Sequence, residues 1–181
     1  MKIKQFRTQR LVLCKLSLRY LADFNQYAKH PLVGPNAGWE PHTSLEHSEF
    51  ILTSLMVANE TWAIVLRENK KMIGTISIQK KGDNRYELGY CLAFEQWNKG
   101  YMGEATKVIV RYFFDKFKGE CLWVSHFPNN YRSKKVIERL GFNFVGEEDT
   151  PLNFKKYSKT YLMYKLTREQ FKENQHVRNK I

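Results

Sequence analysis

The chain has 181 residues and a mass of 21.6 kDa, so it fits one domain that can bury a substantial core. Hydrophobic residues make up 43% and aromatic residues 14% of the chain, which argues against a disordered protein. No apolar run approaches the roughly 18 residues of a membrane span, and the first residues lack the apolar centre of a signal peptide. We therefore expect no membrane association. Three widely spaced cysteines without metal-ligand spacing favour a reduced, cytoplasmic setting and no bound metal.

The net charge of +12 and the isoelectric point near 9.6 predict a basic surface. Such a surface attracts polyanions such as nucleic acid, a ribosome or a polyphosphorylated cofactor. A solvated surface with few acids explains the charge equally well, because several lysines fall in predicted turns and near the C-terminus. Ribosome association is therefore one interpretation of the charge and not its consequence.

The first half of the chain combines alternating and helical apolar patterns. Leucines alternate in residues 10–16, as in a strand, and Ser17 is placed as the N-cap of a helix. That helix ends at His30, because the residue before Pro31 avoids helical geometry. The predicted elements are a strand over 10–16, a helix over 17–30, an irregular segment over 31–41, a helix opened by a capping box at 43–46 and running to about 58, and hairpin strands over 62–66 and 71–79.

The second half alternates strands with helices, which predicts an α/β domain with a mixed sheet. A long helix follows residue 105, because its apolar residues recur every three or four positions, and Lys118-Gly119 stops it. The predicted elements are strands over 86–92 and 121–124, a helix from 130 to 141, and closing strands over 142–145 and 161–166. We expect one domain over 1–181, with a core of about 7–167 and a polar C-terminal tail over 168–181.

A polar turn at residues 96–105, with Gly100 at its centre, leads the strand over 86–92 into the long helix. The start of a helix leaves backbone N–H groups without intrahelical partners, beside the positive end of the helix dipole. The turn therefore predicts a site for a phosphate or pyrophosphate. It matches neither a Walker loop nor a dinucleotide-binding fingerprint, because the glycines and the lysine of those motifs are missing.

An ordered set of motifs covers nearly the whole chain, from about residue 7 to residue 166. Together these motifs resemble the GNAT superfamily of acyl-CoA-dependent N-acetyltransferases, and within it the branch similar to the ribosomal-protein N-terminal acetyltransferases RimJ and RimL. The resemblance implies a single domain with a mixed, mostly antiparallel sheet, a V-shaped splay between two parallel strands, and helices on both faces. The motifs lie at residues 8–13, 38–42, 62–64, 73–76, 87–90, 97–105 and 130–142.

The resemblance implies that acetyl-CoA (coenzyme A) is the cofactor, with its pyrophosphate on the turn and its pantetheine arm along the splayed strand as an added strand. In the branch pattern glycine is usual at Asn98, and alanine or glycine at Met102. Met102 could therefore narrow the turn, and the loss of glycine stiffens it. The expected cofactor-binding residues are Tyr90, Cys91, Leu92, Asn98, Lys99, Gly100, Tyr101, Met102, Gly103, Asn130 and Ser133.

The spacing of Asn130 and Ser133 places Asn130 at a helix cap and Ser133 one turn into the helix. The resemblance implies that Asn130 contacts the cofactor arm and that Ser133 donates a proton to the leaving thiolate. A simple helix cap is the structural alternative. A tyrosine acid of the kind that some relatives carry is not expected, because its position holds Ile137.

The attacking amine must be neutral, and α-amino groups titrate near 8 whereas lysine amines titrate near 10.4. An N-terminal amine therefore needs little help, and Glu87, on the strand that feeds the turn, is our candidate base through a water molecule. The acidic cluster at 147–149 is an alternative that would line the acceptor mouth. Cys91 is expected to be a buried structural thiol and not a nucleophile, because transfer in this family is direct.

The acceptor wall is expected from the two N-terminal helices and the irregular segment, with Tyr27, Trp39 and His42 as lining residues. His42 could serve as a base, although a lone histidine in a loop is more often exposed. We expect a monomeric or homodimeric N-acetyltransferase whose acceptor is a protein or peptide N-terminal amine. The alternatives are a small amine (polyamine, amino sugar or antibiotic), or a non-catalytic module that binds coenzyme A or RNA, although no aromatic-basic RNA motif is present.

Overall fold

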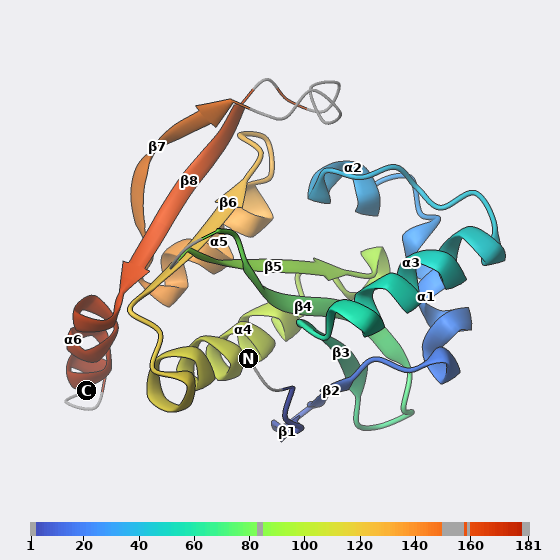
Figure 1. Ribbon diagram of the computed structural model, residues 1–181, viewed down its shortest axis with the longest axis horizontal. Coiled ribbons are helices and arrows are strands. Elements are labelled where there is room, and N and C mark those ends of the chain that lie inside the picture. Colours follow the sequence, from blue (N-terminus) through green and yellow to red (C-terminus); the bar gives the residue numbers. More distant parts are fainter. Residues whose placement is uncertain (1–2, 83–84, 150–157, 159, 179–181) are drawn as a thin grey trace.

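The computed structural model describes residues 3–82, 85–149, 158 and 160–178. These residues form one eight-stranded sheet in the order β1-β2-β3-β4-β5-β6-β8-β7 (Figure 1). Every neighbouring pair is antiparallel except β5 and β6, which are parallel and joined by a helical crossover. The strands are β1 Phe6–Arg7, β2 Leu11–Lys15, β3 Thr61–Leu66, β4 Met72–Lys80, β5 Tyr86–Leu92, β6 Cys121–His126, β7 Asn143–Asp149 and β8 Thr160–Thr167.

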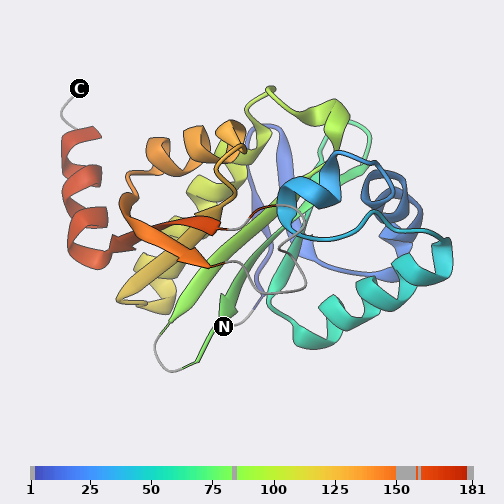
Figure 2. The ribbon, with the colours of Figure 1, turned by 90° about the horizontal axis from the view of Figure 1, so that it is seen from above.

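Helices cover both faces of the sheet, and this confirms the expected architecture. The first three lie against one face of the N-terminal strands, and α4 and α5 lie against the other face (Figure 2). Within the described residues, no helix combines the length and the apolar composition that crossing a membrane requires. The helices are α1 Leu21–Ala28, α2 Val33–Ala37, α3 Leu45–Ala58, α4 Tyr101–Tyr112, α5 Tyr131–Leu140 and α6 Arg168–Arg178, with 3₁₀ turns at Leu18–Tyr20 and Phe94–Gln96 and a π-helical turn at Phe113–Phe117.

Strand β3 shows why the sheet is buried on both sides. All six of its residues are buried, and successive side chains point to opposite faces of the sheet. Trp62, Ile64 and Leu66 therefore enter the core under α4, whereas Ala63 and Val65 enter the core under α1 and α3. The indole N–H of Trp62 is satisfied by the backbone carbonyl of Lys4 at 2.8 Å. Two separate apolar cores thus support the same strand.

The parallel strands β5 and β6 remain together over a short distance only. Tyr86 pairs with Leu122 and Glu87 with Trp123, and among the described residues no β5–β6 pair follows. Beyond that point β5 continues along β4, and β6 continues along β8. The two strands therefore diverge and leave backbone groups of β5 facing a gap, as the V-shaped splay predicts. Unpaired backbone groups at such a place are available to a ligand.

Residues 33–37 form a short helix, α2, although the sequence predicts an irregular segment. Pro35 lies in the first turn of α2, where its missing N–H has no intrahelical acceptor to lose. Gly38 ends the helix in the left-handed conformation, and the amide of Trp39 bonds back to the carbonyl of Gly34 at 3.0 Å. The glycines and the proline therefore bound a helix in this segment and do not prevent one.

The start of α3 and the C-terminal segment also differ from the sequence prediction. The N-cap of α3 is Ser44, whose Oγ accepts the amide of His47 at 3.1 Å, so the cap lies one residue after the start of the predicted box. The C-terminal segment forms α6 from Arg168, where a polar tail was expected. Its anchor is Phe171, which is buried and stacks on Phe114 with ring centroids 4.7 Å apart. Two apolar residues, Phe171 and Val177, in a polar segment were too weak a sequence signal to predict this helix.

Candidate active site

The turn between β5 and α4 presents the start of a helix to the gap beside β5. Gly100 is the N-cap of α4 with φ +80°, and the first intrahelical bond runs from the amide of Glu104 to the carbonyl of Gly100 at 3.1 Å. The amides of residues 101–103 precede that bond and have no helical acceptor. A Cβ added at Gly103 would meet no atom within 4 Å, so the space beside Gly103 in the first turn of α4 is open. This arrangement fits a pyrophosphate.

Asn98 and Met102, the two residues that depart from the branch pattern, leave the turn open. The side chain of Met102 is only 8% exposed and packs into the core under α4, so it does not narrow the turn. Asn98 adopts φ +62°, a left-handed conformation that asparagine tolerates better than most other residues. Asparagine therefore preserves the backbone path that glycine would allow at lower cost.

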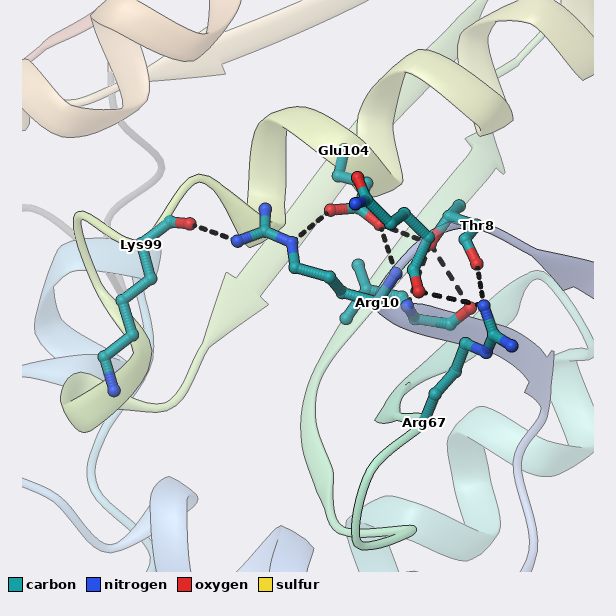
Figure 3. A network of polar contacts seen from close by, with 7 residues as sticks. Thr8, Arg10, Arg67, Lys99 and Glu104 are labelled. Atoms are coloured by element: carbon teal, nitrogen blue, oxygen red, sulfur yellow. Dashed lines mark hydrogen bonds and ion pairs between the residues drawn. The ribbon is translucent and has the colours of Figure 1, made fainter.

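Behind the turn, polar contacts connect it to the N-terminus of β2 (Figure 3). Arg10 donates through Nε to Oε2 of Glu104 at 2.7 Å and through Nη1 to the carbonyl of Lys99 at 2.9 Å. Its guanidinium carbon also lies 4.4 Å from the centroid of the Tyr101 ring. Arg67 in turn donates to the carbonyls of Thr8 and Gln9, each at 2.9 Å. The turn is thus fixed to the segment that precedes β2 and, through Arg67, to the β3–β4 turn.

A cavity of about 410 Å³ lies where β5 and β6 diverge. Its walls come from β5, the end of β6, the start of α5, the end of α2, the β4–β5 turn and the two C-terminal strands. The lining residues are Asn36, Ala37, Gln79, Lys81, Arg85, Glu87, Leu88, Gly89, Tyr90, Ser125, His126, Phe127, Asn130, Ser133, Glu148, Asp149, Tyr161 and Met163.

Glu87 is the half-buried carboxylate at the point of divergence. Its Oε1 accepts a hydrogen bond from Oγ of Ser125 at 3.1 Å, which leaves further lone pairs of the carboxylate for a water molecule or an amine. Burial raises the pKa of Tyr161, and the charge of Glu87 raises it further, so the Tyr161 hydroxyl stays protonated near this carboxylate. Glu148 lies across the same cavity and pairs with Arg85 at 3.4 Å.

Ser133 and Tyr90 place two hydroxyl groups on the other wall of the cavity. The Oγ of Ser133 lies 2.8 Å from the hydroxyl of Tyr90, and Ser133 is only 8% exposed. Burial raises the pKa of Tyr90 above its ordinary value, although the hydrogen bond to Ser133 lowers it. Both hydroxyls are therefore protonated at neutral pH and can donate a hydrogen bond or a proton.

Asn130 is the N-cap of α5, so the simple cap that the spacing allows is present. Its Oδ1 accepts the amide of Ser133 at 3.1 Å, and its Nδ2 donates to the carbonyl of Asn36 at 3.0 Å. The side chain thus fixes the first turn of α5 and ties it to α2 at the edge of the cavity.

Comparison with known proteins decides the family. Residues 10–143 match the family model of the acetyltransferase (GNAT) domain. The chain belongs to the GNAT acetyltransferase family. It is therefore an N-acetyltransferase that uses acetyl-CoA, the donor shared by this family.

Individual relatives agree with this assignment. The N-acetyltransferase p20 of Bacillus licheniformis is 26% identical over 146 residues, which cover 77% of this chain and 82% of p20. A crystal structure of a GNAT acetyltransferase from Bacillus anthracis has a TM-score of 0.83 at 21% identity and covers 92% of this chain and 99% of its own. The ribosomal-protein-S5-alanine acetyltransferase of Vibrio fischeri has a TM-score of 0.72 at 22% identity, with 93% and 98% covered. Both crystal structures share the fold.

The three residues predicted to line the acceptor site do not line the cavity of this GNAT acetyltransferase; they are Tyr27, Trp39 and His42. Tyr27 is buried in the core under α1 and α3. Trp39 packs on His42, with ring centroids 5.3 Å apart. His42 is only 8% exposed, so the alternative that it is an exposed loop histidine is wrong. These aromatic side chains fill the space between the N-terminal helices, and their placement does not support a role in lining the acceptor site.

His42 is also unsuited to act as a base in this enzyme. Its Nδ1 lies 2.8 Å from Oγ of Ser48, inside the N-terminal core. Burial, together with the nearby His47, lowers its pKa from 6.5 to about 4. The ring is therefore neutral at pH 7 and engaged in a structural hydrogen bond.

Cys91 is half-buried on β5, where the sequence predicts a buried structural thiol. Burial raises its pKa to about 12, so the reactive thiolate is negligible at neutral pH. This is compatible with direct transfer, in which the enzyme forms no covalent intermediate.

Sequence analysis missed several cavity residues of the enzyme. Strand β6 runs two residues beyond its predicted end and brings Ser125 and His126 to the cavity, followed by Phe127. Phe127 stacks on Tyr161 with ring centroids 4.9 Å apart. In the sequence, the run from Cys121 to Phe127 contains no glycine or proline before Pro128, and this was the signal that could have extended the strand.

Proposed function

We propose that this GNAT acetyltransferase moves the acetyl group of acetyl-CoA to the N-terminal amine of a protein or peptide. The observation that carries this proposal is the position of the cavity. It opens where β5 leaves β6, with the carboxylate of Glu87 on one wall and the paired hydroxyls of Tyr90 and Ser133 on another. A proton acceptor and a proton donor therefore face the same space at the end of the cofactor cleft.

The residues present fit the cofactor. The backbone of the turn from Asn98 to Gly103, with Lys99, Gly100, Tyr101 and Met102 between them, would hold the pyrophosphate through the open amides at the start of α4. The edge of β5 at Tyr90, Cys91 and Leu92, which β6 does not cover, would hold the pantetheine arm as an added strand, although the carbonyl of Leu92 already accepts the indole N–H of Trp97 at 2.8 Å. When bound, acetyl-CoA supplies the acetyl group as a thioester.

The residues of the chain then act at two places, the attacking amine and the departing sulfur. Glu87, oriented by Ser125, accepts the proton of the attacking amine, directly or through water. Ser133 donates a hydrogen bond from its hydroxyl to the departing sulfur and stabilises its negative charge, Tyr90 supports that hydroxyl with its own hydrogen bond, and the released thiolate takes its proton from solvent. Asn130 contributes by capping α5 and fixing Ser133, and we propose that its role toward the cofactor arm is exerted through this placement.

The acceptor preference rests on charge and on similarity of fold. Three carboxylates, Glu87, Glu148 and Asp149, and two cations, Lys81 and Arg85, line the cavity, and Arg85 pairs with Glu148. Glu87 is therefore the carboxylate that we propose an incoming ammonium group meets before it loses its proton. An α-amino group has a pKa near 8 and supplies more neutral amine at pH 7 than a lysine side chain does. A similar fold occurs in an enzyme named ribosomal-protein-S5-alanine acetyltransferase. The net charge of +12 adds mild support for a RimJ/RimL-like role at the ribosome, and an amine acceptor of small size is the second candidate.

A thiol-release assay with an acceptor panel tests the proposal. The panel contains peptides with free N-terminal alanine or serine, the same peptides with a blocked N-terminus and one internal lysine, a polyamine and an amino sugar. We expect turnover with the free N-termini and little with the blocked peptides. Higher kcat/KM for the polyamine or the amino sugar would overturn the acceptor class and leave the acetyltransferase assignment intact.

Thermal melting separates an enzyme from a binding module. Millimolar acetyl-CoA should raise the melting temperature of the wild type and of Glu87→Gln alike, because ligand that binds only the folded state stabilises it. Only the wild type should release thiol at the full rate. Binding without turnover of any acceptor in the wild type would favour the non-catalytic module.

A further inference from the structure

We infer that Arg10 is a positioning residue for the cofactor turn, residues 97–103. It holds the backbone of the turn from behind and neutralises Glu104 at the start of α4, so that the turn is ready for a pyrophosphate in the free enzyme. The inference rests on the proposed cofactor site. It assigns a function to Arg10, which immediately precedes β2 and is 89 positions away from Lys99 in the sequence.

The contacts of Arg10 reach three places on the turn and the first turn of α4. Nη1 donates to the carbonyl of Lys99 at 2.9 Å, and Nε donates to Oε2 of Glu104 at 2.7 Å. The backbone amide of Arg10 adds a bond to Oε1 of Glu104 at 2.9 Å. The guanidinium also stacks over Tyr101, and a Cβ placed on Gly100 would lie 3.5 Å from Nη2. One planar side chain thus spans the turn (Figure 3).

Arg10 is itself held in place. Arg67, from the β3–β4 turn, donates to the carbonyls of Thr8 and Gln9, and its amide bonds to the carbonyl of Arg10 at 2.9 Å. The amide of Thr8 also bonds to the carbonyl of Leu11 at 2.9 Å. Although 42% of the Arg10 side chain is exposed, its backbone is fixed to the β3–β4 turn through the amide of Arg67 and to α4 through Glu104.

The backbone of the turn explains why such support matters. Asn98 and Gly100, on either side of Lys99, both have positive φ, at +62° and +80°. Asparagine tolerates this region better than most residues but at a higher cost than glycine, so a contact that holds the turn also holds Asn98 in this conformation. The carbonyl of Lys99, which accepts the bond from Arg10, lies between Asn98 and Gly100, so this bond holds the turn in its positive-φ conformation. Without it, a ligand would have to order the turn as it binds, and affinity would fall.

The charge of Glu104 gives Arg10 a second role. A carboxylate in the first turn stabilises the free helix, but it would repel an anion bound at the same end. Burial raises the pKa of Glu104, but hydrogen bonds from Thr8 and Arg10 and the guanidinium charge outweigh burial and hold the pKa below its ordinary value. Glu104 is therefore ionised at neutral pH, and Arg10 cancels its charge at 2.7 Å. The positive end of α4 remains available to the cofactor.

The test compares two donors with Arg10→Ala. One donor is acetyl-CoA, and the other is S-acetylpantetheine, which has the thioester and the arm but no pyrophosphate. We expect kcat/KM for acetyl-CoA to fall about 10-fold, mainly through KM, since a lost charge-assisted bond is worth about one factor of ten. For S-acetylpantetheine we expect less than about a twofold change. Arg111→Ala is the matched control, because Arg111 is an exposed arginine on α4 that pairs only weakly with Asp115 at 3.7 Å.

Equal losses with both donors would overturn the inference, because they would show a general structural defect. If calorimetry shows that Arg10→Ala binds coenzyme A as tightly as the wild type does, the inference about Arg10 is wrong, but the proposed cofactor site stands. Failure of the wild type to bind coenzyme A would overturn the proposed cofactor site as well. If Arg10→Ala does not fold, Arg10→Lys replaces it, because lysine keeps the charge but lacks the planar fork that holds Lys99 and Glu104 together. Amide exchange of residues 98–103 in the free enzyme should then be faster than in the wild type, and equal exchange would contradict the positioning role.

Discussion

The hydroxyl groups of Tyr90 and Ser133 lie 2.8 Å apart and tie β5 to the first turn of α5. The two residues are 43 positions apart in the sequence and lie on different elements, but their hydroxyls share one wall of the cavity. Burial keeps the Tyr90 hydroxyl protonated, so the pair can donate a hydrogen bond to a group in the cleft. It is therefore the first target for substitution.

Ser133→Ala should lower kcat by about 10-fold or more, because the proposed donor to the departing sulfur is lost. Tyr90→Phe should have a smaller effect, because it keeps the ring and removes only the supporting hydroxyl. Stopped-flow thiol release at saturating substrates measures both effects. Tyr131→Phe is the control, since Tyr131 is an exposed tyrosine on the same helix. Wild-type kcat in Ser133→Ala would show that Ser133 is not the donor.

Glu87→Gln should lower kcat/KM at pH 7 by about 100-fold, because the amide cannot accept the proton of the amine. The loss should shrink toward pH 9, where an α-amino group with a pKa near 8 is already neutral. The pH profile of kcat/KM with an N-terminal peptide measures this change. Glu147→Gln provides the matched control, because Glu147 is exposed on β7 and does not line the cavity. A pH-independent deficit in Glu87→Gln would argue against a role as base.

Met102→Ala should lower the free energy of unfolding by about 2–3 kcal/mol without improving cofactor binding. The reason is that Met102 packs into the core under α4 and does not project into the turn. Urea denaturation gives the stability, and calorimetric titration with coenzyme A gives the affinity. Tighter binding by the alanine variant at unchanged stability would mean that Met102 does obstruct the turn.

His42 should make the stability of the enzyme depend on pH below neutrality. Its pKa is about 4 in the folded state and near 6.5 in the unfolded state, so only the unfolded state binds its proton between these values. Stability from this group is thus complete above pH 6.5 and is lost as the pH falls toward 4. In His42→Gln the slope of unfolding free energy against pH should be smaller in that window, by up to about 1.4 kcal/mol per pH unit. Denaturant titrations at several pH values measure the slope, and identical slopes for variant and wild type would contradict the prediction.

Local patterns were sufficient for most of the fold. The alternation in β2 and the three- and four-residue spacing in α4 identify these elements, because a strand or a helix exposes one face to a core. Segments whose order depends on distant contacts were missed. α2 contains a glycine and a proline but is ended by Gly38, and α6 depends on Phe171 reaching Phe114.

For the candidate site, the sequence by itself identified the turn that we propose holds the cofactor, and its neighbours, because residues 97–103, the end of β5 and the start of α5 are continuous motifs with local backbone geometry. Tertiary structure alone decided which side chains share the cavity. It brought Ser125 to Glu87 and Ser133 to Tyr90, and it placed His42 in a core. It also joined Arg10 to the turn from across the sheet. Such contacts depend on strand register and helix packing, which act between residues far apart in the chain and leave no periodic pattern in it.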